Sequence, residues 1–148
     1  MLKRLLHVYW RFSRGLTIGV RGVVLDGNGQ VLLVRHGYAE GWHLPGGGVE
    51  PGESLLDALA RELEEEGNVR LTGVPELHGI FHNARDSRRD HVAVYAVREF
   101  KWGGEPAPTL EIRESKFFPL ERLPEGTTAA TRRRLCLLYT SPSPRDRS

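Results

Sequence analysis

The first residues of the chain alternate apolar and basic side chains at helical spacing. The apolar positions fall on one side, and they are Leu2, Leu5, Leu6, Tyr9 and Phe12. The basic positions fall largely on the other side, and they are Lys3, Arg4, His7, Arg11 and Arg14. This pattern predicts a short amphipathic helix within residues 1–15. We expect its apolar stripe to pack on the same domain or on a dimer mate, with contact to a membrane or nucleic acid as the alternative.

From residue 16 onward, runs rich in Val, Leu and Ile replace the helical period. They predict strands at residues 16–26, 30–36, 42–44, 69–72, 76–82, 91–100 and 116–119. The turn sequence Asp26-Gly27-Asn28-Gly29 between the first two runs predicts a hairpin. Residues 120–123 suggest a turn of helix and residues 131–139 a terminal helix. Strands and helices mix without strict alternation, which predicts an α/β fold with a mixed sheet covered by helices.

A helix is also predicted to begin after Ser54, a good N-cap, with Asp57 completing a capping box. At about 100° per residue, one apolar stripe contains Leu56, Leu59 and Leu63. The helix should end at Gly67-Asn68, because both residue types tolerate the left-handed conformation.

Three carboxylates lie about a quarter-turn from this stripe. Glu62, Glu65 and Glu66 are spaced i, i+3 and i+4, which places them on one face of the helix, whereas Asp57 and Glu64 should point into solvent. Like charges at this spacing repel one another. A hard divalent cation removes that conflict, because Mg²⁺ prefers carboxylate and water oxygens. The spacing therefore predicts a metal-binding helix.

Composition narrows the class of protein. The chain has 148 residues and a formal net charge of +2, which suits one domain and does not by itself indicate nucleic-acid binding. Its single cysteine, Cys136, excludes an internal disulfide framework and a cysteine-based zinc site. No metal-ligand spacing occurs among the histidines considered, His36, His43, His82 and His91. No apolar run approaches the ~20 residues of a membrane span, and no signal peptide is evident. We therefore expect a cytoplasmic protein.

One stretch of the chain resembles the Nudix box, G-x5-E-x7-R-E-U-x-E-E-x-G-U, where U is a bulky aliphatic residue. The positions in register are Gly47, Glu53, Arg61, Glu62, Leu63, Glu65, Glu66 and Val69. The one departure is Asn68 where the box has Gly, and we expect Asn to be tolerated at a left-handed helix end. Residues 31–35, 42–47 and 117–124 are similar to the usual flanks of the box, so the resemblance covers residues 16–135.

The resemblance implies a Nudix α/β/α sandwich with a mixed β-sheet. It also implies hydrolysis of a diphosphate linkage in a nucleoside diphosphate joined to another group, X. The cofactor would be Mg²⁺, with Mn²⁺ as an alternative, and its implied ligands are Gly47, Glu53, Glu62, Glu65 and Glu66. Arg61 would orient a glutamate through an ion pair. For the general base the family offers a box glutamate, Glu65 or Glu62, or one from a later loop, Glu111 or Glu114.

The expected partner is a small nucleotide diphosphate rather than nucleic acid, with a homodimer left open. The candidate substrate-binding residues are Arg35, Gly46, Gly47 and Gly48. Further basic candidates are Arg85, Arg88 and Arg89, whereas a core role is favoured over base stacking for Trp42, Phe81, Tyr95 and Phe117. A catalytically silent nucleotide-binding module or regulator of the same fold is the alternative function. An isoprenoid-diphosphate isomerase is disfavoured, because it needs a cysteine in its site and Cys136, near the end of the chain, is a poor candidate.

The end of the chain, residues 136–148, is expected to be disordered, because its last residues lack hydrophobic side chains. From about Leu135 the segment also resembles translated adapter sequence, so the natural chain is expected to end differently there. Cys136 would then have no functional meaning.

Overall fold

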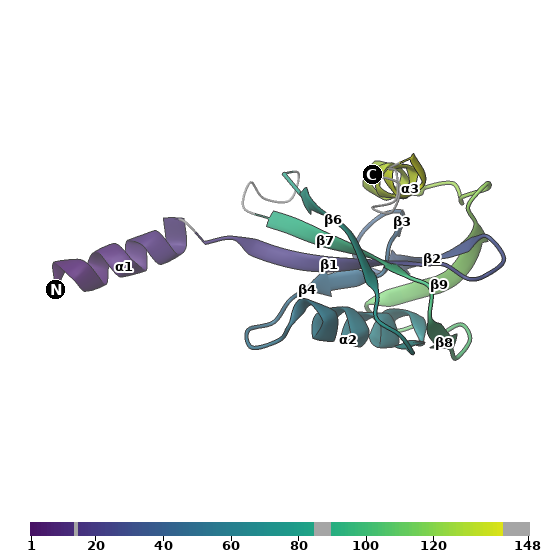
Figure 1. Cartoon of the computed structure of the whole chain (residues 1–148), viewed down its shortest axis with the longest axis horizontal. Coiled ribbons are helices and arrows are strands. Elements are labelled where there is room, and N and C mark those ends of the chain that lie inside the picture. Colours follow the sequence, from purple (N-terminus) through teal and green to yellow (C-terminus); the bar gives the residue numbers. More distant parts are fainter. Residues whose placement is uncertain (14, 85–89, 141–148) are drawn as a thin grey trace, which may run out of the picture.

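The computed structural model describes residues 1–13, 15–84 and 90–140 (Figure 1). Three helices occur in the described part of the chain: α1 (Leu2–Ser13), α2 (Leu55–Gly67) and α3 (Ala129–Thr140). Nine strands accompany them in the same residues: β1 (Thr17–Val24), β2 (Gln30–His36), β3 (Trp42–His43), β4 (Gly46–Gly48), β5 (Val69–Leu71), β6 (Glu76–His82), β7 (Asp90–Val97), β8 (Phe100–Trp102) and β9 (Ile112–Pro119). Most of these elements lie where the hydrophobic pattern predicts them.

The central sheet has the strand order β4-β1-β7-β6. Strands β1 and β7 pair in parallel from Thr17 opposite Asp90 to Val24 opposite Val97. The pairs β1–β4 and β6–β7 are antiparallel, so the sheet is mixed, as predicted. A second sheet, β3-β2-β9, is antiparallel, and β5 pairs with β8 in a third.

The predicted hairpin between the first two strands is wrong. The turn does form, because the Asp26 carboxylate accepts hydrogen bonds from the backbone N–H groups of Asn28 and Gln30, both at 2.9 Å. Beyond one isolated bridge between Leu25 and Val31, however, the two strands do not pair. They separate into different sheets, because each finds its long partner far along the chain, β7 for β1 and β9 for β2.

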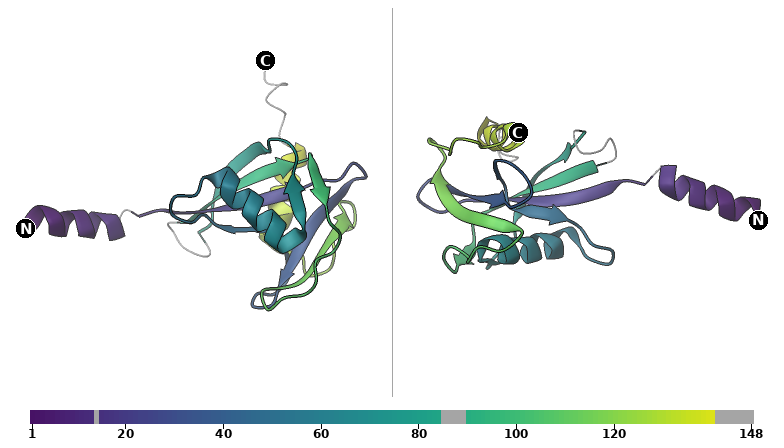
Figure 2. Two further views of the ribbon diagram at one scale, coloured as in Figure 1. Left: turned by 90° about the horizontal axis from the view of Figure 1, so that it is seen from below. Right: turned by 180° about the vertical axis from the view of Figure 1, so that it is seen from behind.

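Helices α2 and α3 cover opposite faces of the sheets (Figures 1 and 2), which confirms the α/β/α sandwich. Alternation along the strands divides the core accordingly. One cluster packs on α2 and contains Val20, Val24, Leu32, Leu59, Leu63, Ala93 and Tyr95. The other packs on α3 and contains Val23, Leu33, Trp42, Leu44, Val92, Val94 and Leu135. Neighbouring residues of one strand thus serve different layers, as the period of two requires.

Helix α2 begins and ends as predicted. The Ser54 hydroxyl accepts a hydrogen bond from the Asp57 N–H at 3.1 Å. At the other end Asn68 adopts the left-handed conformation, with φ 54° and ψ 33°. The apolar stripe differs from the prediction by one residue, because Leu56 is 40% exposed and Ala58 is buried beside Leu59 and Leu63.

Helix α3 starts after Thr128, whose hydroxyl accepts a hydrogen bond from the Thr131 N–H at 3.2 Å. It extends through Thr140, into the segment 136–148 that was expected to be disordered, and residues 141–148 lie outside the described residues. Residues 120–123 form a turn instead of helix, with the Arg122 N–H donating to Pro119 O at 3.0 Å.

Helix α1 lies away from the sheets, beyond the N-terminal end of β1 (Figures 1 and 2). Its apolar side chains are exposed, for example Leu2 at 72% and Leu5 at 65%. The expectation that this stripe packs on its own domain is therefore wrong, and packing on a dimer mate stays a prediction. Among the described residues, no helix is both long enough and apolar enough to cross a membrane.

Candidate functional site

The glycine run before the acidic helix forms strand β4 at the edge of the central sheet, although no strand was predicted there. Gly46 has a φ of 149°, and a Cβ there would overlap the Val20 carbonyl, so only glycine fits this close approach. Arg21 crosses beneath the run and donates from Nη1 to Leu44 O at 2.8 Å and to Gly46 O at 3.3 Å. The backbone at Gly46 is thereby fixed from both sides.

Gly47 brings the backbone against the acidic helix. A Cβ on Gly47 would lie 2.5 Å from Glu62 Oε1 and 2.8 Å from Glu62 Cδ. A side chain at Gly47 would displace the Glu62 carboxylate from its place against this strand. The glycine strand and the glutamate face of α2 therefore form one surface.

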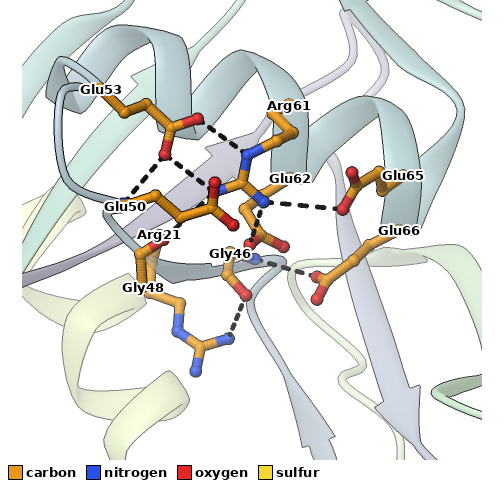
Figure 3. Close-up of polar contacts among 9 residues, drawn as sticks. All are labelled: Arg21, Gly46, Gly48, Glu50, Glu53, Arg61, Glu62, Glu65 and Glu66. Carbon is orange, nitrogen blue, oxygen red and sulfur yellow. Dashed lines mark hydrogen bonds and ion pairs between the residues drawn. The ribbon is translucent and has the colours of Figure 1, made fainter.

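Glu66 is the buried carboxylate of this surface, with 8% of the residue exposed. Its Oε2 accepts a hydrogen bond from the Gly46 N–H at 3.0 Å (Figure 3). Burial raises the pKa of Glu66 to about 8, against the lowering effect of the Gly46 hydrogen bond, and the nearby charge of Glu62 raises it further. Burying this carboxylate in its charged form is unfavourable in free energy, and a bound cation would offset that penalty.

Arg61 links the loop before α2 to the glutamates on the helix (Figure 3). Its guanidinium binds Glu53 through two nitrogens, at 2.8 and 2.9 Å, and Glu62 Oε1 at 2.9 Å. It also donates to Gly48 O at 3.2 Å and lies 3.7 Å from Glu65 Oε2. The hydrogen bond from Arg61 lowers the pKa of Glu53 to about 2, and Glu53 in turn raises the pKa of Arg61. The predicted ion pair between Arg61 and a glutamate is thus present, with both Glu53 and Glu62 as partners.

The three helix glutamates line an open cleft of about 450 Å³, and residues 109–112 form its opposite wall. Glu65 is the most exposed of the three, with 61% of its side chain accessible against 13% for Glu62. Of the two later glutamates, Glu111 lines this cleft. Glu114 instead lies opposite Arg35 in the second sheet, and its oxygens pair with Arg35 at 2.9 Å and Lys116 at 3.6 Å.

A second depression, of about 360 Å³, adjoins the cleft and is formed by residues 35–41 and Arg113. The two are joined by the Gly37 N–H, which donates to Glu111 O at 2.8 Å. Tyr38 projects here, 77% exposed, and its pKa is raised first by burial of its hydroxyl and then by the charge of Glu66.

Sequence reasoning missed Arg21, Tyr38 and Arg113 as residues of this region. Arg21 lies well before the glycine run in the sequence and contacts it only because β1 pairs with β4. The other two come from loops whose direction depends on the second sheet. A basic residue on a strand otherwise made of Thr, Ile, Gly and Val was the one available signal, and it marked Arg21.

The aromatic candidates are largely core residues, as expected. Trp42 and Tyr95 are buried, and Trp42 packs its ring edge-on against Phe118 at 4.8 Å. Phe81 is partly buried under α3, and Phe117 stacks with Phe100 beside α2. The basic candidates Arg85, Arg88 and Arg89 lie outside the described residues.

The donor chemistry of this surface fits a hard divalent cation. Glu62, Glu65 and Glu66 line one cleft, and carboxylate oxygens are donors that Mg²⁺ and Mn²⁺ prefer. Within residues 1–13, 15–84 and 90–140, no three acidic, His or Cys groups are gathered closely enough to form a ready cage. The Arg61 guanidinium explains this arrangement, because it draws Glu53 and Glu62 onto its own nitrogens.

Comparison with known proteins places these features in a family. The family described as NUDIX domain matches residues 15–138 of the chain. The chain is similar to diphosphoinositol polyphosphate phosphohydrolase 2 of Rattus norvegicus, with 38% identity over 93 residues, which are 62% of this chain and 51% of the relative. It is also similar to an ADP-ribose pyrophosphatase of Methanocaldococcus jannaschii, with 30% identity over 110 residues, which are 73% of this chain and 64% of the relative.

A solved structure agrees with the fold. The MutT NUDIX hydrolase of Burkholderia pseudomallei superposes with a TM-score of 0.69 and 28% identity, covering 82% of this chain and 96% of that one. The chain spans between about half and two thirds of the length of the two sequence relatives above. The match to the domain family covers most of the chain.

Proposed function

The chain belongs to the NUDIX domain family, and from this premise we propose that it hydrolyses a diphosphate linkage. The substrate class is a nucleoside diphosphate joined to another group X, and the cofactor is Mg²⁺, with Mn²⁺ as an alternative. The names of the relatives support this class, since one is a phosphohydrolase of diphosphoinositol polyphosphates and one is an ADP-ribose pyrophosphatase.

The observation that most supports the proposal is the buried carboxylate of Glu66. The Gly46 N–H holds it in place beside Glu62 and Glu65, and burial raises its pKa to about 8. A protein surface evolved for stability alone avoids such a group, because a buried charge needs a partner. A divalent cation bound by Glu62, Glu65 and Glu66, with Glu53 and the Gly47 carbonyl in support, would be that partner. When bound, the cation neutralises phosphate charge and activates a water molecule.

Arg61 acts in this proposal as a positioning residue. Its fork fits the Glu53 carboxylate with two nitrogens and reaches Glu62 with the other side of the guanidinium. It fixes the orientation of the Glu53 and Glu62 carboxylates and limits repulsion between them. Because it also binds Gly48 O, it ties the glycine strand to the helix.

For the general base we propose Glu65, whose carboxylate is accessible to a water molecule in the cleft and is only loosely held by Arg61. Glu62 is firmly engaged by Arg61. Glu111 is the alternative, because it lies on the opposite wall of the same cleft. Glu114, with both oxygens paired to cations, has the weaker geometry for a base, and we propose that it orients Arg35.

The adjoining depression is the proposed site for the rest of the substrate. Arg35 and Arg113 supply positive charge, and the exposed ring of Tyr38 supplies a flat apolar surface with a hydroxyl. This combination suits a phosphate or ribose-phosphate group next to a ring. The strand Gly46–Gly48 offers backbone that a diphosphate can approach closely.

The test is a substrate panel with and without Mg²⁺. Purified protein is incubated with deoxynucleoside triphosphates, ADP-ribose, nucleotide sugars, dinucleoside polyphosphates, NADH and 5′-triphosphorylated RNA, and released phosphate, pyrophosphate and nucleoside monophosphate are measured. Glu65→Gln should lower kcat by about 10²- to 10⁴-fold on any active substrate. Glu64→Gln, on the exposed side of the same helix, is the matched control and should leave kcat within about twofold.

The alternative function is a catalytically silent nucleotide-binding module. Tight nucleotide binding without turnover, equal for the wild type and Glu65→Gln, would favour it over hydrolysis. The full set of box glutamates argues against it. A cytoplasmic location and a homodimer stay predictions.

A further inference from the structure

Helix α1 presents an apolar face that nothing in the described chain covers. Exposed fractions along it are 72% for Leu2, 65% for Leu5, 39% for Leu6, 53% for Val8 and 65% for Tyr9. Both views in Figure 2 show the helix projecting beyond the sheets. Large apolar side chains gathered on one exposed helix mark an interaction surface.

The polar side of α1 is entirely basic. Lys3, Arg4 and His7 lie on it, and no Asp or Glu occurs in the chain before Asp26. At about 100° per residue, these three side chains span one sector and the apolar ones another. This charge is unlike that of α2, where carboxylates predominate.

The charge selects the kind of surface that can cover α1. Two copies of α1 packed through their apolar faces would leave both basic sectors outside the contact, with no acidic residue on either helix to pair with them. An anionic lipid surface satisfies both sides of the helix at once, because headgroup charge meets Lys3 and Arg4 while the acyl boundary accepts the leucines. Tyr9 suits the same boundary, since its ring is apolar and its hydroxyl is polar.

We propose that α1 is a membrane-surface anchor that lies in the plane of an anionic lipid bilayer. The helix is 12 residues long, so it rests on the bilayer and does not span it. The catalytic domain would then be held at the membrane by its N-terminal end. The proposal is independent of which diphosphate the domain hydrolyses.

The test uses the full chain and vesicles of phosphatidylcholine with or without phosphatidylserine, with binding measured by co-sedimentation. The wild type should sediment with the mixed vesicles at low salt and be released by added salt. The double variant Leu5→Glu, Leu6→Glu should lose binding by at least about 10-fold, since charge enters the apolar face. Replacing Lys3 and Arg4 by Gln should also lower it by at least about 10-fold.

Val74→Glu is the matched control. Val74 is 85% exposed in the loop between β5 and β6, so the control adds one negative charge, against two in the double variant, at an exposed apolar position away from α1, and binding should remain within about twofold. Circular dichroism of each variant with and without vesicles reports whether α1 stays helical. Nucleotide hydrolysis in solution, measured in parallel, reports whether the domain is folded.

Three results would overturn the proposal. One is equal binding to vesicles with and without phosphatidylserine, and another is absence of binding to both. The third is a dimer in analytical ultracentrifugation that Leu5→Glu, Leu6→Glu converts to monomer, which would assign the apolar face to a second copy of the chain.

Discussion

Helix α1 has 12 residues and helix α2 has 13, and both are amphipathic. In α1 the apolar side chains point into solvent and the polar side is basic. In α2 Leu59 and Leu63 are fully buried against the central sheet, and the polar side is acidic and internally paired through Arg61.

The difference shows that periodicity predicts a helix without predicting what covers it. Helix α2 is covered because β1 and β7 present small and branched residues that fit it; Gly22 lies against Leu59 and Leu63, where a Cβ would come within 3.0 Å of Leu63 Cδ2. Within the described residues, no comparable surface meets α1. The four predictions below test this contrast, beginning with the largest expected effect.

The pH dependence of stability should reveal the cost of burying the Glu66 carboxylate on α2. The pKa of Glu66 is raised in the folded state to about 8, so its favourable contribution is present below the unfolded pKa of ~4.5 and is lost as pH rises toward 8. The free energy of unfolding of the metal-free wild type, relative to Glu66→Gln, should fall by roughly 3 to 4 kcal/mol between about pH 5 and pH 8. Urea denaturation at each pH measures it.

Mg²⁺ provides the sharper form of this experiment. Added to the wild type at about pH 8, it should recover much of the lost stability, because the cation replaces the missing counter-charge. Glu66→Gln should respond far less, and Glu64→Gln, on the exposed side of the helix, should behave as the wild type. An identical pH profile for the wild type and Glu66→Gln would show that the buried carboxylate is not strained.

Truncating one leucine on each helix tests the packing contrast directly. Leu63→Ala should lower the free energy of unfolding by about 3 kcal/mol, because it opens a cavity in a fully buried site. Leu5→Ala should change it by less than about 0.5 kcal/mol, because Leu5 is exposed. Chemical denaturation of both variants gives the comparison, and a similar loss for the two would mean that α1 is covered in solution.

Replacing Arg61 tests whether the acidic side of α2 needs an internal cation. Arg61→Lys keeps the charge and removes the fork that holds Glu53 and Glu62, so kcat/KM should fall by about 10- to 100-fold. The matched control is Arg70→Lys, because Arg70 pairs with exposed Glu64 at 3.6 Å and should matter by less than about twofold. Metal affinity measured by calorimetry should follow kcat/KM; an unchanged affinity and rate would remove Arg61 from the site.

The end of α2 should show the smallest effect. Asn68→Gly removes a left-handed non-glycine residue but also loses the hydrogen bond from Asn68 Nδ2 to Gly104 O at 3.3 Å. The two changes oppose each other, so stability should shift by less than about 1 kcal/mol and activity by less than about twofold. A large gain in kcat would mean that Asn at this position is not tolerated as we infer.

The acidic helix was predictable because its information is local. Ser54, the spacing of the glutamates and the Gly67-Asn68 end all act within a few residues, and the structure has the cap and the left-handed end where the sequence predicts them. Leu56 was assigned to the buried stripe because helical periodicity alone cannot separate the edge of a face from its centre. Whether Leu56 lies at the edge or the centre of the buried face depends on the tilt of α2 on the sheet.

Strand pairing was less predictable, because it depends on partners distant in the sequence. The turn Asp26-Gly27-Asn28-Gly29 formed, yet the strands on either side of it pair elsewhere. Strand β4 was missed because three glycines have no side chains to show a period of two. Glu111 and Glu114 were indistinguishable for a related reason: only the register of β9 against β2 turns one toward the cleft and the other toward Arg35.

The parallel pairing of β1 with β7 also sets the order in which the protein can fold during synthesis. Thr17 meets Asp90, and Val24 meets Val97, so the centre of the sheet cannot assemble before the ribosome has released residue 97. Until then α2 has no complete surface to cover it, and its leucines remain accessible to chaperones or to other nascent chains. Contacts so distant in sequence make folding slow. A nascent chain arrested before β7 emerges should therefore remain sensitive to protease throughout α2.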